Sequence, residues 1–153
     1  MRVSVIGGST VTDEQYQQAR EVGKQLGEHG HDVVCGGLTG VMEAACRGAS
    51  EAGGHTVGIL PGEHTSAAND YVDTAIATGL GNARNVLVVL NGAAVIAVDG
   101  GTGTLSELGH ALDIDRPVAG LGTHRLDGAV GGDAIEHVDT PAEAVEYVEA
   151  AVQ

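Results

Sequence analysis

Residues 93–104 read Ala-Ala-Val-Ile-Ala-Val-Asp-Gly-Gly-Thr-Gly-Thr, an apolar run that leads directly into a glycine-rich loop. A short run without polar residues, rich in β-branched side chains and closed by glycine, is typical of a strand buried on both faces of a sheet. Helical periodicity follows from Leu105 to about Ile114. This stretch therefore predicts the strand, loop and helix of one unit in a parallel α/β sheet.

The same alternation of short β-branched runs and longer helical patterns extends over most of the chain. Thr12, with Gln15 three residues later, resembles a capping box, and Gly30 is a typical helix stop. The arrangement predicts a Rossmann-like, doubly wound parallel sheet with helices on both faces. Further strands are expected at residues 2–6, 32–35, 56–60, 71–77 and 118–121, further helices at 12–29, 41–52, 83–90 and from 139–141 onward, and loops at 122–133.

The 153 residues are expected to form one domain, residues 1–153, because no linker, internal repeat or low-complexity tract divides them. The hydrophobic fraction of 42% contains no Phe or Trp. A core packed from small branched side chains suits a parallel sheet that is covered on both faces.

The net charge of −14 excludes some classes of partner. No basic stripe is available to neutralise phosphates, so we expect neither nucleic acid nor an anionic membrane surface as a partner. The acidic residues are spread along the chain and predict a solvated acidic surface. Such a surface suits the salt-rich cytoplasm of a halophile, where a Debye length of about 3 Å at 1 M removes self-repulsion. An ordinary acidic protein is the alternative.

Cysteine and histidine usage points to no metal centre. Cys35 and Cys46 lack metal-ligand spacing and are expected to be reduced, buried side chains in a cytoplasmic protein. The seven histidines are scattered, so surface or hydrogen-bonded histidines are favoured over metal ligands. No apolar stretch is long enough for a membrane span, and the first one is too short for a signal peptide.

Three predicted strands end in glycine pairs, Gly7-Gly8, Gly36-Gly37 and Gly100-Gly101, and each pair is followed by a helix start. In an open parallel sheet such loops meet at one edge, where ligands bind. Helix N-termini offer unpaired amides and partial positive charge to an anion, and glycine lets the backbone approach it. The pattern of three such loops therefore favours a site for a phosphorylated ligand. The alternative is that the glycines serve only tight turns, which need glycine even without a ligand.

Two familiar nucleotide motifs are absent from the sequence. The dinucleotide fingerprint would need a third glycine where Ser106 stands, and an acidic residue after the strand that ends at Cys35. A P-loop would need Gly-Lys-Ser or Gly-Lys-Thr, and neither occurs. Pyridoxal phosphate needs a Schiff-base lysine, but Lys24, the single lysine, lies within a predicted helix far from every glycine loop. No bound cofactor is expected.

From residues 3–9, Val-Ser-Val-Ile-Gly-Gly-Ser, to about Leu121, the chain resembles the LOG (Lonely Guy) family, long mislabelled as possible lysine decarboxylases. The family motif P-G-G-x-G-T-x-x-E is matched at residues 99–107, with Asp99 in place of proline. An upstream Arg-Lys pair is matched by Arg84-Asn85, and a G-G-x-x-G-x-M segment by residues 36–42. The related molybdenum cofactor carrier protein binds its ligand without the glycosidic hydrolysis that the resemblance to LOG proteins implies.

The resemblance implies a homodimer that hydrolyses the N-glycosidic bond of a nucleoside 5'-monophosphate such as AMP and releases base and ribose 5-phosphate. It implies Arg84 and Glu107 as the catalytic pair. With the glycine loops, it gives as phosphate- or nucleotide-binding residues Gly7, Gly8, Ser9, Gly36, Gly37, Thr39, Gly40, Met42, Gly100, Gly101, Thr102, Gly103 and Thr104.

A physical argument supports the same pair. Glu107 lies one turn into the helix after the glycine loop, within reach of a sugar bound there, where a carboxylate stabilises an oxocarbenium-like state or deprotonates water. Arg84 suits a phosphate or the departing base. Alternatively, Glu107 is a first-turn acid favoured by the helix dipole, and Arg84 pairs with a surface carboxylate. A non-catalytic binder of a nucleotide or molybdenum cofactor is the main rival function, and an interaction protein with a vestigial pocket is the other.

Overall fold

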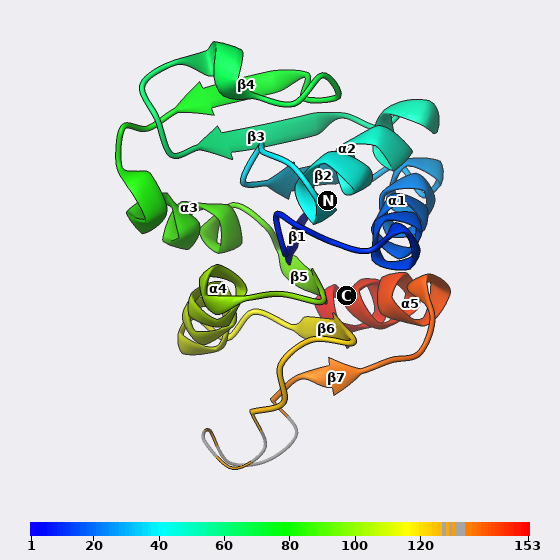
Figure 1. The fold of residues 1–153 in the computed structure, drawn as a ribbon. Helices are drawn as coiled ribbons and strands as arrows, with labels where there is room; N and C mark the ends of the chain where they lie inside the picture. The colour runs from blue at the N-terminus through cyan, green and yellow to red at the C-terminus, as the bar shows by residue number, and fades with distance from the viewer. Residues whose placement is uncertain (127, 129, 131–133) are drawn as a thin grey trace.

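The computed structural model describes residues 1–126, 128, 130 and 134–153. Within these residues a sheet of seven parallel strands runs through the centre of the molecule in the order β4-β3-β2-β1-β5-β6-β7 (Figure 1). The strands are β1 Arg2–Gly7, β2 Asp32–Cys35, β3 Thr56–Leu60, β4 Thr74–Ala77, β5 Ala94–Val98, β6 Val118–Leu121 and β7 Glu136–His137.

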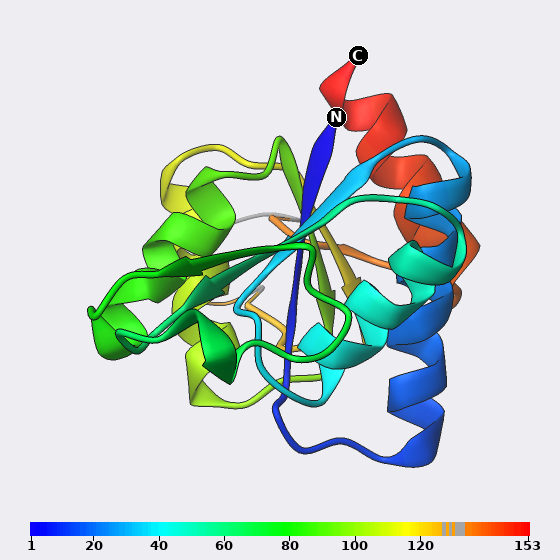
Figure 2. The ribbon, with the colours of Figure 1, turned by 90° about the horizontal axis from the view of Figure 1, so that it is seen from above.

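Helices cover both faces of this sheet, as Figures 1 and 2 show. Helices α1, α2 and α5 lie on one face, and α3 and α4 lie on the other. The predicted Rossmann-like, doubly wound fold is confirmed. The helices are α1 Asp13–Glu28, α2 Val41–Glu51, α3 Asn85–Leu90, α4 Thr102–Asp113 and α5 Pro141–Val152, with the 3-10 turns η1 Thr65–Ala67 and η2 Gly81–Arg84.

The apolar character of β5 follows from its central place in the sheet. Ala94, Ile96 and Val98 pack into the core beneath α1, α2 and α5. Val95 and Ala97, the residues between them, pack into the core beneath α3 and α4. Successive side chains of a strand point to opposite faces, so a strand covered on both sides needs apolar residues at every position.

The winding direction reverses between β1 and β5. After β1 the chain builds β2, β3 and β4 on one side, and β5 then pairs with the other side of β1, with Gly7 opposite Val98. The loops that leave these two strands therefore separate, one toward α1 and one toward α4. Ligands of doubly wound sheets bind in the crevice at such a switch point.

Helix α1 begins and ends as its sequence predicts. The Thr12 hydroxyl accepts from the Gln15 amide, and the Gln15 side chain accepts from the Thr12 amide, which completes the capping box. His29 is the C-terminal cap, and Gly30 follows with a φ of +75°. The final helix predicted from 139–141 onward is also confirmed: α5 starts at Pro141, with Thr140 as its cap.

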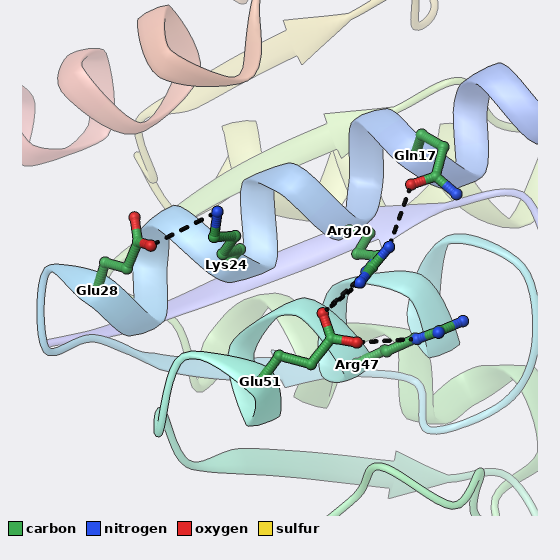
Figure 3. Close-up of polar contacts among 6 residues, drawn as sticks. All are labelled: Gln17, Arg20, Lys24, Glu28, Arg47 and Glu51. Carbon is green, nitrogen blue, oxygen red and sulfur yellow. Dashed lines mark hydrogen bonds and ion pairs between the residues drawn. The ribbon is translucent and has the colours of Figure 1, made fainter.

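Helices α1 and α2 approach each other closely. A Cβ atom on Gly48 would lie 1.9 Å from the Arg20 carbonyl, and one on Gly23 would lie 2.0 Å from the Ala45 carbonyl. Above this contact Arg20 pairs with Glu51 at 2.7 Å, and Arg47 Nε donates to Glu51 at 3.1 Å (Figure 3). These ion pairs are exposed and screened by salt, so the glycine contact decides the helix spacing.

Some predicted boundaries differ from the structure. Strand β4 begins at Thr74 instead of residue 71, because the preceding backbone turns back to bind Thr56: the Thr56 hydroxyl donates to the Tyr71 carbonyl, and the Asp73 amide donates to the Thr56 carbonyl. Helix α4 begins at Thr102 instead of Leu105, and the predicted helix at 83–90 starts as the turn η2. The short β7 was not predicted. The predicted loops at 122–133 fall partly outside the described residues.

Cys35 and Cys46 are buried and free, as expected, with their sulfur atoms 3.4 Å apart. His29 Nδ1 and His31 Nε2 lie 2.8 and 2.7 Å from one oxygen of Glu149, a carboxylate that α5 brings from far along the sequence. Among the described residues no helix combines the length and apolar character that a membrane crossing requires.

Candidate functional site

A cavity of about 490 Å³ opens at the switch point, beyond the carboxyl ends of β1 and β5. Its walls come from the loops after these strands, the first turns of α4, and η2 with the start of α3. The sequence led us to expect a ligand site at this edge. The lining residues are Gly7, Gly8, Ser9, Thr10, Leu38, Met42, Asn82, Arg84, Asn85, Asp99, Gly100, Gly101, Thr102, Gly103, Thr104 and Glu107.

The first turn of α4 presents main-chain amides to this cavity. The Leu105 amide donates to the Gly101 carbonyl at 3.1 Å. Among the described residues, no protein acceptor is found for the amides of Thr102, Gly103 and Thr104. Unpaired amides at a helix N-terminus, together with the helix dipole, form a favourable environment for an anion.

The glycines of this loop have different structural roles. A Cβ atom on Gly100 would lie 2.5 Å from the Thr104 side chain, and its φ of +131° suits glycine alone, so packing requires Gly100. A Cβ atom on Gly101 would have no heavy atom within 4 Å, and one on Gly103 would meet only Asn85 Nδ2, at 3.8 Å. Packing therefore does not require glycine at positions 101 and 103, and the missing side chains leave open space in the wall of the cavity.

Four predicted binding residues do not line the cavity: Gly36, Gly37, Thr39 and Gly40. They hold the neighbouring structure in place. The Thr39 hydroxyl donates to the Ser9 carbonyl at 3.0 Å, and a Cβ atom on Gly40 would lie 2.3 Å from the Gly8 carbonyl. Gly36 accepts from Arg84, while Gly37 donates to the Cys35 sulfur. Met42, from the same segment, does line the cavity.

Arg84 is buried, with 6% of its surface exposed, and its guanidinium is already engaged by the protein. Nε donates to the Ile59 carbonyl at 2.9 Å, Nη1 donates to Asn85 Oδ1, and Nη2 reaches the Gly36 carbonyl at 3.4 Å. Because a guanidinium carries five N–H groups, these bonds leave two for a ligand. Burial lowers the pKa of Arg84, and the nearby Glu107 opposes this effect.

Glu107 is the buried acid of the cavity, with 8% of its surface exposed. No hydrogen bond or ion pair joins its carboxylate to another described residue. Burial raises its pKa to about 7, although the positive charge of Arg84 acts in the opposite direction. The carboxyl group can therefore gain or lose a proton near neutral pH, as a general acid or base must.

Asp99 also faces the cavity, and its backbone is left-handed, with a φ of +53°. Its amide donates to the Leu121 carbonyl at 3.0 Å, and its carbonyl accepts from the Thr123 hydroxyl at 2.7 Å. Its Oδ2 lies 3.3 Å from the position of a Cβ atom on Gly8, across the crevice. The carboxylate thus stands between the two glycine loops.

Sequence reasoning did not assign Asp99, Thr10, Leu38, Asn82 or Asn85 to the site, although all five line the cavity. Asp99 and Asn85 were visible as departures from the family motif, and that was a usable signal. Thr10, Leu38 and Asn82 carried none, because they reach the cavity through the course of the loops. No group of three or more His, Cys, Asp or Glu side chains in the described part of the chain could hold a metal ion.

Solved structures resemble this chain over almost its full length. The molybdenum cofactor binding protein of Rippkaea orientalis is 34% identical, with a TM-score of 0.93, and the match covers 99% of this chain and 97% of that one. The molybdenum cofactor carrier protein of Chlamydomonas reinhardtii is 35% identical, with a TM-score of 0.89 and coverage of 97% and 96%.

Sequence comparison finds further relatives and a matching family. An uncharacterised protein of Archaeoglobus fulgidus is 42% identical over 147 residues, which are 96% of this chain and 93% of that protein. A rice protein named as a probable cytokinin riboside 5'-monophosphate phosphoribohydrolase is 35% identical over 112 residues, 70% of this chain and 46% of its own length. The model of the SLOG cluster4 family matches residues 1–151. The chain therefore belongs to the SLOG cluster4 family, and the resemblance to LOG proteins seen in its motifs reflects real relationship.

Proposed function

We propose that the cleft binds a nucleoside 5'-monophosphate and that the protein hydrolyses its N-glycosidic bond. The observation that carries this proposal is Glu107, a buried carboxyl group that lines the cavity, has no partner among the described residues and has a pKa raised to about 7. The open amides at Thr102 and Gly103 offer a place for the phosphate two turns or less from that carboxyl group. The similarity to the rice protein supports the same reaction class.

In this mechanism the phosphate is held at the start of α4, which brings the ribose over Glu107. The ionised carboxylate stabilises the positive charge that develops on the sugar as the bond to the base breaks, or takes a proton from the attacking water. Water adds to the anomeric carbon, and the base leaves with the bonding electron pair and gains a proton. Arg84, fixed by protein carbonyls, keeps a positive charge near Glu107 and offers its remaining N–H groups to the ligand.

The test is release of free base from AMP and other nucleoside monophosphates, followed by chromatography. We expect turnover in the wild type and a loss of about 10²-fold or more in Glu107→Gln, the range for removal of a general acid or base. Asp113→Asn, an exposed acid on the same helix, is the matched control and should retain activity. Equal turnover in Glu107→Gln and the wild type would refute the assignment of Glu107.

A second candidate is a non-catalytic carrier of a phosphorylated ligand such as the molybdenum cofactor. The similarity to two molybdenum cofactor proteins over 97% or more of the chain favours it. The departures at Asn85 and Asp99 point the same way, because they alter the motif that the hydrolases share. A rise in melting temperature with a molybdopterin-type ligand, without release of base from any mononucleotide, would select this function.

We also propose that the protein acts as a homodimer or a higher homo-oligomer. Three exposed leucines lie near the cleft, with exposed fractions of 54%, 50% and 41%: Leu80 just before η2, Leu90 on α3 and Leu105 on α4. Light scattering of the pure protein tests this proposal, and a monomer at all concentrations would contradict it.

A further inference from the structure

We propose that the cleft takes up its phosphorylated ligand together with a divalent cation, which lies between the Asp99 carboxylate and the phosphate oxygens. The inference rests on the proposed function only in requiring a phosphate at the start of α4. It does not depend on hydrolysis, and it applies equally to a carrier. It assigns to Asp99 a role that the motif position, where the family has proline, does not suggest.

The charges of the cavity are the first argument. Among the described residues, the charged side chains that line the cavity are Asp99, Glu107 and Arg84, which carry a net charge of −1 when both acids are ionised. A phosphate dianion would make it −3. Arg84 already donates to the Ile59 and Gly36 carbonyls and to Asn85, which limits its contribution to the ligand. The helix terminus adds only about half a positive charge. A divalent cation removes most of this excess.

The placement of Asp99 is the second argument. Its main chain is fixed on both sides by bonds to Leu121 and Thr123, while no described residue donates a hydrogen bond to its carboxylate. The side chain points across the crevice toward Gly8. A free carboxylate held rigidly beside a phosphate site is the common protein contribution to a magnesium site, where phosphate oxygens and water complete the octahedron.

Glu107 is the third argument, because it is more than nine-tenths buried, lines the cavity and has no partner among the described residues. A buried polar group without a partner indicates that a ligand completes the site. The described residues offer two carboxylates at this cavity, which is too few to hold a cation without a ligand. The cation should therefore bind weakly to the free protein and strongly only with the ligand.

Calorimetric titration of the whole protein with AMP and with ribose 5-phosphate, in MgCl₂ or in EDTA at matched ionic strength, tests the proposal. In the wild type we expect magnesium to tighten binding of the phosphate compound at least about tenfold, with a reciprocal gain in magnesium affinity. Asp99→Asn should bind more tightly than the wild type in EDTA, because a repulsive charge is gone, and should respond to magnesium less than about twofold.

Asp115→Asn is the matched control, because Asp115 also has a left-handed backbone, with a φ of +54°, but lies outside the cavity. Asparagine tolerates that conformation, so both variants should fold. Equal affinity of the wild type with and without magnesium, or a full magnesium response in Asp99→Asn, would overturn the proposal. Magnesium-dependent binding of ribose 5-phosphate with no hydrolysis of AMP would leave it standing while the proposed reaction failed.

Discussion

The ionisation of Glu107 makes the stability of the folded protein depend on pH. Its pKa rises from 4.5 to about 7 on folding because burial disfavours the charged form. The protonated form therefore favours the folded state fully below about pH 4.5, and this contribution is lost as pH rises through about 7. From the shift, the loss is on the order of 3 kcal/mol.

Glu107→Gln removes that loss, because the amide resembles the protonated acid and cannot ionise. We expect the variant to be more stable than the wild type by on the order of 3 kcal/mol at pH 8 and nearly equal to it at pH 4.5. Urea denaturation at both pH values measures the difference. Asp113→Asn, on the exposed face of the same helix, should show no such dependence. A Glu107→Gln variant that is less stable at pH 8 would contradict this account of the cavity.

Gly101 and Gly7 separate the two reasons for a glycine at the sheet edge. A methyl group on Gly101 enters open space beside the cavity, whereas one on Gly7 would lie 2.2 Å from the Val98 carbonyl. Gly101→Ala should therefore keep its stability within about 0.5 kcal/mol and weaken phosphate binding about tenfold or more. Gly7→Ala should lose about 1–3 kcal/mol of stability. Thermal unfolding and calorimetry with ribose 5-phosphate distinguish these outcomes, and unchanged binding in Gly101→Ala would show that the loop does not approach the ligand.

The sequence predicted which residues belong to the site better than it predicted their hydrogen bonds and side-chain directions. Glu107 and the glycine loop could be placed together because four to seven residues separate them, and a helix start fixes their relation. The bonds of Arg84 could not be predicted, because its acceptors lie far away in the sequence, Ile59 on β3 and Gly36 in the loop after β2. The direction of the Asp99 side chain depends on one left-handed residue, which no local pattern specifies.

The contact between α1 and α2 depends on glycines that the sequence alone did not single out. Gly48→Ala would place a methyl group 1.9 Å from the Arg20 carbonyl and 2.7 Å from the Lys24 amide, both rigid backbone atoms. The helices must separate to admit it, at a cost of about 2–3 kcal/mol. Gly109→Ala, on α4, meets no atom within 4 Å and should stabilise the protein by about 0.5–1 kcal/mol through helix propensity. Chemical denaturation measures both, and a neutral Gly48→Ala would show that the contact is not close.

The strength of the local signal also explains which elements were predicted. Strand β5 is apolar at every position because both faces are covered, and α1 carries a complete capping box, so both were evident. Strand β7 has two residues, Glu136 and His137, and pairs only through its backbone with β6. The start of α4 was predicted at Leu105, three residues after its true start at Thr102. The composition of Thr102 and Gly103 is typical of a loop, but in the structure both residues belong to the first turn of the helix.

The net charge of −14 is a property of the whole chain and predicts how its stability responds to salt. At pH 7 the acidic surface repels itself, and raising KCl from about 0.1 to 2 M shortens the Debye length from about 10 Å to 2–3 Å. The melting temperature should rise by on the order of 5–10 °C over that range. Near pH 4.6, the isoelectric point, there is no net repulsion to screen, and the salt response should become small. Scanning calorimetry over the KCl series at both pH values provides the measurement. An equal rise in melting temperature at both pH values would show that salt acts by strengthening apolar burial. The surface would then be that of an ordinary acidic protein and not one adapted to high salt.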